Sequence, residues 1–136
     1  YACMSWKDIR KLTESGRVEI ANHTHDMHNL KKRRGCQKKE GETLSQYRVA
    51  LAADFEKNRA KIQEATGVKT TAFAFPFGAL GKEARKVLKE EGYQVVFTCT
   101  EEVNHLTGDP DELRDLGRFN RANGLDRETL FQKLEN

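Results

Sequence analysis

Short apolar segments alternate with longer segments of helical periodicity along this chain, and this alternation is what most limits the folds open to it. In the clearest helical segment, TLSQYRVALAADFEKNRAKIQEATG, apolar side chains recur every three or four residues and Gly67 marks the end. The expected strands are residues 18–22, 71–76, 93–99 and 116–120, and the expected helices are residues 5–16, 43–67, 82–91 and 126–134. Strands joined by helices favour a parallel sheet with helical crossovers, so the sequence predicts an α/β fold.

The length of 136 residues predicts one domain, covering residues 1–136. Apolar residues make up 37% of the sequence and charged residues 33%, and many of the charged ones fall on the outer faces of the expected helices. No apolar run reaches the roughly 18 residues of a membrane span, and no signal peptide is recognisable. Three widely spaced cysteines predict neither a disulfide framework nor a metal knuckle, so we expect free thiols that pack in the interior.

The net charge of +3 is unevenly distributed, because six Lys and Arg residues fall within residues 31–39 and the remainder of the chain sums to −3. Such a loop can hold phosphates or acidic polymers, and it can equally be a solvated loop beside an acidic neighbour. Gly35 and Cys36 interrupt the run, and no aromatic residue is interleaved for base stacking. We therefore expect no nucleic-acid binding.

Three of the four histidines, His23, His25 and His28, lie within six residues, directly after the first expected strand. Neutral imidazole is the commonest protein ligand for zinc and similar metals. A spacing of five turns two rings away from each other on a helix, so His23 and His28 converge only if the chain bends after the strand. Side chains of Thr24 and Asp26 are expected to tie that bend, through backbone amides or a ligand's far ring nitrogen. Surface or capping histidines would explain the same spacing.

A second candidate motif is FAFPFG, in which a proline, an aromatic residue and a glycine end another expected strand. Pro76 removes a backbone donor and ends sheet pairing, while Gly78 permits an unusual backbone angle. The N–H of Phe77 is then free to point into a cleft, as an oxyanion donor does. The motif is also an ordinary turn. Its position matters because the carboxyl ends of parallel strands carry the chemistry in such folds, and His23 lies at a strand end as well.

Together and in this order, MSWKDIRKLTESGRVEIANHTHDMH and FAFPFG resemble the polysaccharide deacetylases of the NodB-homology family, carbohydrate esterase family four. The histidine spacing of five and the form AFAFPFG resemble the branch that acts on poly-β-1,6-N-acetylglucosamine. The resemblance implies an irregular (β/α) barrel and a divalent metal, most often zinc, with His23 and His28 as ligands. It implies an oxyanion contact from the backbone amide of Phe77. The residues expected to support the ligands or to contact substrate are Thr24, Asp26, Phe75, Pro76 and Gly78.

The activity that the resemblance implies is metal-dependent hydrolysis of N-acetyl groups on N-acetylglucosamine polysaccharide, which releases acetate and leaves free glucosamine. Because the family works outside the cytoplasm, the parent protein is expected to be extracellular or at the cell surface. The alternative is a non-catalytic module that binds glycans or anionic polymers through the basic loop.

The chain departs from the family pattern at the aspartates. The family's first motif, of the Thr-Phe-Asp-Asp-Gly type, supplies an aspartate ligand and an aspartate general base from the first strand, and no Asp-Asp pair occurs here. We therefore expect a partial barrel lacking its first strand or strands, little or no activity from this chain alone, and self-association through an exposed sheet edge. His25 or Asp26 can fill the ligand gap, and Asp26 is the more plausible supporting group. His105 is only a faint echo of the family's late Leu-x-His.

Overall fold

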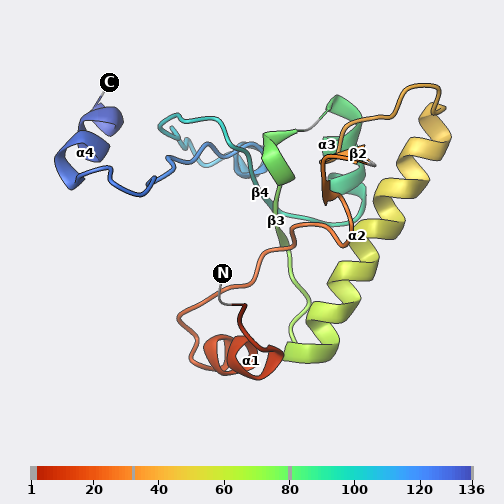
Figure 1. Cartoon of the computed structure of the whole chain (residues 1–136), viewed down its shortest axis with the longest axis horizontal. Coiled ribbons are helices and arrows are strands. Elements are labelled where there is room, and N and C mark those ends of the chain that lie inside the picture. The colour runs from red at the N-terminus through yellow and green to blue at the C-terminus, as the bar shows by residue number, and fades with distance from the viewer. Residues whose placement is uncertain (1–2, 32, 80, 136) are drawn as a thin grey trace.

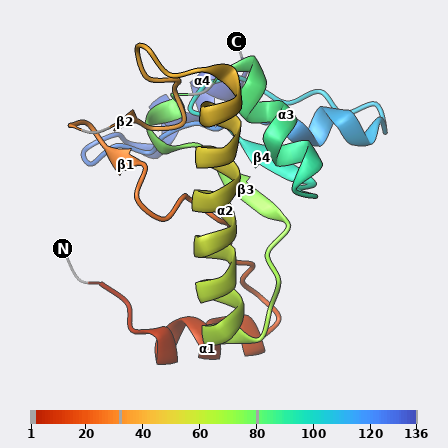
Figure 2. The same cartoon turned by 90° about the vertical axis from the view of Figure 1, so that its right-hand side faces the viewer.

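The computed structural model describes residues 3–31, 33–79 and 81–135. A long helix, α2, runs beside a short parallel sheet, with α1 across one end of α2 and α3 beside the other end (Figures 1 and 2). The helices are α1 (Trp6–Glu14), α2 (Leu44–Thr66), α3 (Lys82–Glu90) and α4 (Arg127–Glu135), with short 3-10 turns η1 (Pro76–Gly78) and η2 (Pro110–Arg114). The strands are β1 (His28–Asn29), β2 (Arg33–Arg34), β3 (Ala72–Ala74) and β4 (Val95–Phe97). The α/β prediction is confirmed.

The parallel sheet is built around β3 and β4, which pair in parallel. Single parallel bridges extend this pair on both sides, with Asn22 beside β3 and Leu116 beside β4. The four chain segments therefore lie side by side in their sequence order, the arrangement of successive strands in a (β/α) barrel. Within the described residues this sheet is an open arc and does not close into a barrel.

The first and last predicted strands are wrong in extent, because each is reduced to a single bridge. The carbonyl of Ile20 accepts a hydrogen bond from the Thr70 hydroxyl at 2.5 Å, in place of a ladder partner. The side chain of Asn104 pairs with both the N–H and the carbonyl of Gly117, each at 2.9 Å. At both edges of the parallel sheet, hydrogen bonds from side chains thus take the place of backbone ladder hydrogen bonds. The basic segment predicted as a loop contains the antiparallel pair β1–β2.

Helix α2 supplies most of the surface on which the sheet packs. A capping box between Thr43 and Gln46 starts the helix, and Gly67 ends it with a φ of 78°. Its buried residues are Tyr47, Leu51, Phe55, Arg59 and Ile62. Leu44 belongs to the predicted apolar stripe but lies exposed in the first turn. The core under the helix is aromatic, with edge contacts among Phe55, Phe73, Phe75 and Tyr93.

Helix α1 forms as predicted, with Ser5 as its N-cap. It crosses the end of α2 and none of its residues is buried (Figure 2). Trp6 is 49% exposed and Leu12 is 36% exposed, so much of the apolar side of α1 faces solvent.

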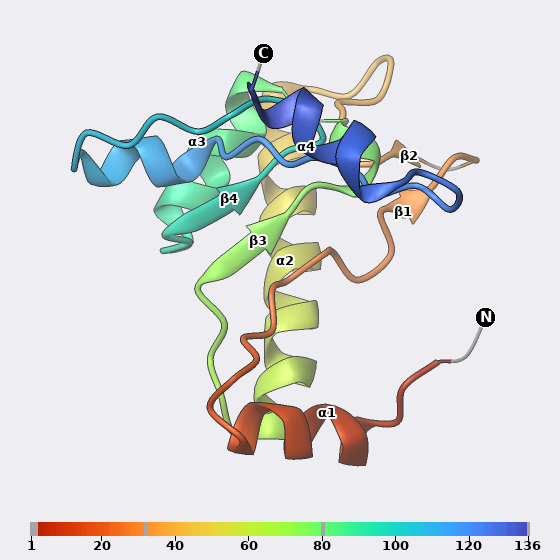
Figure 3. The same ribbon diagram turned by 90° about the vertical axis from the view of Figure 1, so that its left-hand side faces the viewer.

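Helix α4 lies apart from the sheet at the end of an extended segment (Figure 1), and it is in front when the molecule is viewed from that side (Figure 3). Asp126 starts it as predicted, by accepting a hydrogen bond from the N–H of Thr129 at 2.8 Å. An ion pair of 2.8 Å between Lys133 and Glu101 ties the helix back to the segment after β4. Among the helices of the described ranges, none has the length and apolar content needed to cross a bilayer.

Candidate active site

The imidazoles of His23 and His28 converge at the carboxyl edge of the sheet. His23 directly follows the bridging residue Asn22, and His28 begins β1 after the bend. The two ring centroids are 5.1 Å apart and the ring planes are inclined by 44°. Two imidazoles that bind one tetrahedral zinc through nitrogens at about 2.0–2.1 Å have ring centroids roughly 5 Å apart. The separation therefore fits a shared divalent ion.

A backbone carbonyl fixes the orientation of His23. Nδ1 of His23 lies 2.7 Å from the carbonyl oxygen of Ala74, at the end of β3. Because a carbonyl oxygen only accepts, Nδ1 carries the proton and Nε2 keeps its lone pair for a metal. Desolvation lowers the pKa of His23 below its ordinary value of 6.5; the Ala74 contact opposes this shift, and the nearby charges of His28 and Arg118 reinforce it. The neutral ring is the form that binds metals.

The bend between the two histidines is held from α2. The carboxylate of Asp54 accepts hydrogen bonds from the N–H groups of His25 at 2.8 Å and Asp26 at 2.9 Å. Thr24 has a φ of 73°, which is rare for a β-branched residue. Its N–H donates to Oδ1 of Asn22 at 2.9 Å. The prediction that the Thr24 side chain ties the bend is wrong, because within the described residues its buried Oγ1 has no hydrogen-bond partner.

Asn22 joins the bend to the core through a buried polar network. Its Nδ2 donates to the carbonyl of Phe55 at 2.9 Å and to the hydroxyl of Tyr93 at 2.5 Å. Its Oδ1 accepts from Asn58 at 2.7 Å as well as from the backbone of the bend. A buried amide with all its polar positions used rigidifies its surroundings. The sequence analysis predicted neither this network nor the role of Asp54. The one sequence signal for the network was Asn58, a polar residue on the otherwise apolar face of α2.

Phe77 forms a left-handed turn directly after β3 and Pro76. Its φ is 57° and its ψ is 10°. Gly78 follows with a φ of 61°, the glycine-favouring angle that the motif predicted. The Phe77 ring stacks on the ring of His28, with centroids 4.2 Å apart. In the described part of the chain no acceptor takes the N–H of Phe77, so this donor is available beside the histidine pair.

The core supports this turn from below. Phe75 and Pro76 are buried, and the N–H of Phe75 donates to the carbonyl of Phe97 at 3.0 Å. A Cβ at Gly78 would lie 2.8 Å from the Cβ of Cys99, which leaves no room for a side chain there. These motif residues therefore hold the Phe77 turn in place, and contact with a substrate remains a prediction for them.

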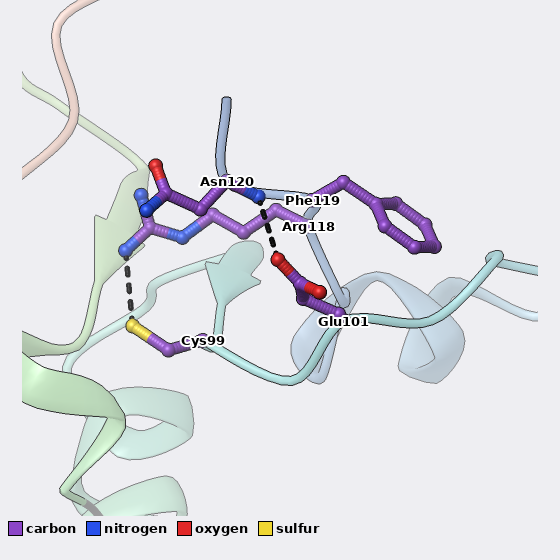
Figure 4. Close-up of a pocket in the computed structure, with 5 residues that line it drawn as sticks. All are labelled: Cys99, Glu101, Arg118, Phe119 and Asn120. Carbon is purple, nitrogen blue, oxygen red and sulfur yellow. Dashed lines mark hydrogen bonds between the residues drawn. The ribbon is translucent and has the colours of Figure 1, made fainter. Parts of the chain in front are cut away.

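A pocket of about 500 Å³ opens at the same edge of the sheet (Figure 4). Arg118 crosses it, donating to the carbonyl of Thr98 at 2.7 Å and to Sγ of Cys99 at 3.3 Å. The residues that line the pocket are Cys99, Glu101, Arg118, Phe119 and Asn120. The pocket adjoins the site because Cys99 also approaches Gly78 and the charge of Arg118 acts on His23. Its mixture of an aromatic ring with charged and amide groups suits a polar ligand of sugar size.

The histidine pair provides two metal ligands. Nowhere in residues 3–31, 33–79 and 81–135 do three or more His, Cys, Asp or Glu side chains gather as a metal site. The expectation that His25 or Asp26 completes the ligand set is therefore wrong, because the Asp54 clamp fixes that part of the bend against α2. His105 lies exposed in the segment after β4. The donor set fits zinc through two imidazoles, with further ligands needed for the usual three of a catalytic site.

Residues 1–96 match the family model described as Polysaccharide deacetylase. The chain is 29% identical over 111 residues to a poly-beta-1,6-N-acetyl-D-glucosamine N-deacetylase of Staphylococcus epidermidis, a match that covers 82% of this chain and 36% of that protein. A protein of the same name from Staphylococcus aureus is 24% identical over 98 residues, covering 72% of this chain and 32% of that one. The chain thus spans about a third of the length of these curated relatives.

Solved structures of deacetylases share the fold. IcaB from Ammonifex degensii matches with a TM-score of 0.70 and 25% identity, over 94% of this chain and 50% of that chain. The deacetylase domain of BpsB from Bordetella bronchiseptica matches with a TM-score of 0.70 and 25% identity, over 85% of this chain and 48% of that chain. The family match covers most of the chain, and the chain belongs to the polysaccharide deacetylase family.

Proposed function

We propose that this chain supplies the two-histidine part of a metal-dependent N-deacetylase site that acts on N-acetylglucosamine polysaccharide. The observation that carries the proposal is the convergence of the His23 and His28 imidazoles at the sheet edge, with the Phe77 ring stacked on His28. Within the described residues no acceptor takes the N–H of Phe77. Membership of the polysaccharide deacetylase family supports the reaction class.

In this proposal each group has a distinct task. His23 and His28 would hold a divalent metal such as zinc, and the Ala74 carbonyl would leave Nε2 of His23 as its ligand atom. When bound, the metal supplies Lewis acidity to the acetamide carbonyl. The N–H of Phe77 donates to the same oxygen as negative charge develops on it during attack by water. The C–N bond of the acetamide then breaks, and the products are acetate and the free amine of glucosamine.

The donor set limits what the 136 residues do alone. The sequence contains no adjacent aspartate pair, and in the described ranges no third His, Cys, Asp or Glu joins the two histidines as a metal site. A positioned general base contributes typically about 10²–10⁴-fold to hydrolysis. We propose that the isolated chain has little or no deacetylase activity, and that a carboxylate ligand and base must come from elsewhere in the complete site.

The substrate and location follow from the relatives in this proposal. The staphylococcal relatives are named for poly-β-1,6-N-acetylglucosamine, and we propose the same polymer class as substrate and an extracellular or cell-surface location. The alternative is a non-catalytic module that binds glycans or anionic polymers through the basic loop, residues 31–39, without hydrolysis.

Acetate release from β-1,6-linked N-acetylglucosamine oligomers tests the proposal, measured with the full-length protein that carries this sequence and with zinc present. His23→Ala or His28→Ala is expected to lower the rate by at least about 100-fold, since each removes a metal ligand. His105→Ala, in an exposed loop, is the control and is expected to stay within about twofold of wild type. Oligomer binding without acetate release would favour the glycan-binding module.

A further inference from the structure

The β1–β2 hairpin and the loop after it, residues 28–42, carry the chain's positive charge in concentrated form. We call this segment the basic hairpin. Six Lys and Arg residues fall within residues 31–39, whereas the rest of the chain sums to −3. Its described, exposed cations are Lys31, Arg34, Lys38 and Lys39. The deacetylase chemistry proposed above uses none of them.

One cation, Arg33, stabilises the basic hairpin itself. Arg33 is buried and donates to both carboxylate oxygens of Glu42, at 3.0 and 2.5 Å, and to the carbonyl of Gln37 at 2.7 Å. The same carboxylate accepts from the N–H of Lys39 at 3.0 Å. This internal pair organises the loop and neutralises Arg33, so the remaining cations are free to face outward.

Among the described residues the outward cations form no ion pair, although the charge of Lys39 acts on the carboxylate of Glu42. Among the residues that the structure describes, Lys31, Arg34 and Lys39 have no carboxylate within ion-pair distance, and Lys38 donates only to backbone carbonyls. Some cations elsewhere in the chain are paired. Examples are Arg48 with Glu83 and Glu90, Arg85 with Asp115, Lys89 with Asp111, and Lys133 with Glu101. The basic hairpin is distinguished by the density of its cations, since four exposed ones fall within residues 31–39.

These cations surround a concave surface. A pocket of about 320 Å³ lies between β2 and the following loop, with Lys31, Arg34, Lys38 and Lys39 around it and Glu40 as its one acidic residue. A guanidinium and ammonium groups around a concavity suit phosphate. The pocket has no aromatic lining, so it offers no platform for stacking a base. Its lone exposed aliphatic residue, Leu30, is too little apolar surface to anchor a membrane.

The hairpin is fixed against the candidate active site. Gly35 has a φ of 56°, and a Cβ there would lie 2.6 Å from the carbonyl oxygen of Pro76. The N–H of Cys36 donates to the carbonyl of Ala79 at 2.9 Å. β1 itself begins at His28. A ligand in the basic pocket is therefore held beside the histidine pair by a packed connection.

We propose that the basic hairpin binds the phosphodiester groups of a base-free anionic polymer, of the polyol-phosphate class, and holds that polymer beside the deacetylase site. Three features of the described pocket favour this ligand: the cations without ion pairs, the concave surface and the lack of aromatic side chains that could stack on a base. The site does not depend on hydrolysis, so it stands or falls separately from the deacetylase proposal.

The test is a titration of the 136-residue chain with a synthetic glycerol-phosphate oligomer at several salt concentrations. Arg34→Ala with Lys39→Ala is expected to weaken binding by about tenfold or more and to reduce the slope of log K against log salt by about 1.4. The matched control is Lys57→Ala with Lys61→Ala, which removes the same charge from exposed positions of α2. It is expected to change the affinity by less than about threefold, through long-range charge alone. Thermal melts of both double variants establish that each is folded.

Three outcomes would overturn the proposal. An oligodeoxynucleotide of equal charge that binds more tightly would make the site one for nucleic acid. Binding to phosphatidylglycerol vesicles but not to the soluble oligomer would make it a membrane contact. Equal losses in the hairpin and α2 variants would show attraction to net charge without a site. None of these binding measurements depends on acetate release. Their results can therefore be interpreted even if the deacetylase proposal fails.

Discussion

The phenyl ring of Phe77 stacks on the imidazole of His28, with centroids 4.2 Å apart and planes inclined by 25°. This contact joins the two sequence motifs of the site, the histidine bend and the turn after β3. The left-handed turn of Phe77 fixes its backbone, and the ring of the same residue contacts His28. The stack therefore places the residue of the proposed oxyanion donor against a proposed metal ligand.

Removing the Phe77 ring is expected to loosen His28 while leaving the backbone donor in place. Phe77→Ala removes a stacking contact worth about 0.5–1.5 kcal/mol, so the zinc affinity of the chain should fall by about two- to tenfold. Competition with a chromophoric chelator measures the zinc affinity of each variant. Phe77→Tyr keeps the ring and is expected to bind zinc as wild type does. Equal affinity of the Ala and Tyr variants would mean that the stack does not position His28.

Asp54 is expected to matter for metal binding although it is not itself a ligand. Asp54→Ala leaves two backbone N–H groups of the bend without their acceptor, which should lower the free energy of unfolding by about 2–3 kcal/mol. Because the bend carries both histidines, zinc affinity should fall by about 10–100-fold. Glu64→Ala, exposed on the same helix, is the control and should change stability by less than about 0.5 kcal/mol. Tight zinc binding by the folded Asp54 variant would argue against the clamp.

The hairpin scaffold predicts unequal thiol reactivity. Cys36 is fully buried under the basic hairpin, and burial raises the pKa of its thiol, whereas Cys3 and Cys99 are exposed. A thiol reagent at neutral pH should label two cysteines quickly and the third only slowly. Glu42→Gln removes the charge opposite Arg33 and should speed the slow phase. Three equally fast thiols in the wild-type chain would contradict the packed hairpin.

The same ion pair predicts a pH dependence of stability. The hydrogen bond from Arg33 holds the pKa of Glu42 below its ordinary value of 4.5. Because the folded-state pKa is the lower one, the ionised carboxylate stabilises the chain above about pH 4.5, and this contribution is lost as the pH falls through the folded value. The melting temperatures of wild type and Glu42→Gln should therefore differ at neutral pH and converge as the pH falls through the folded-state pKa of Glu42.

The open sheet edge predicts self-association. Of residues 3–22, the described part before His23, Asn22 alone bridges to β3, and Val18 is 39% exposed. An exposed edge with apolar side chains pairs readily with another chain. Sedimentation velocity should show a concentration-dependent dimer that Val18→Lys shifts toward monomer. A chain that stays monomeric at high concentration would show that this edge is protected.

Local sequence signals predicted the elements well and their long-range partners poorly. The apolar stripe of α2 and its end at Gly67 were predictable because helix periodicity and C-capping act over a few residues. The spacing also predicted that His23 and His28 converge only if the chain bends between them, and the structure has that bend. Asp54 could not be foreseen, because it meets the amide of His25 across 29 positions of the chain. The first predicted strand shrank for a similar reason, since its ladder partner at Ile20 is replaced by the distant Thr70 side chain.

Zinc titration of the chain with its histidine ring nitrogens observed by NMR tests the shared site of His23 and His28 most directly. Four histidines are present, so His25 and His105 serve as internal controls. Our account predicts that zinc shifts the Nε2 resonances of His23 and His28 together, at one stoichiometric equivalent, and leaves the other two unchanged. Zinc that shifts His25 or His105 instead, or binds the His23→Ala variant as tightly as wild type, would contradict it.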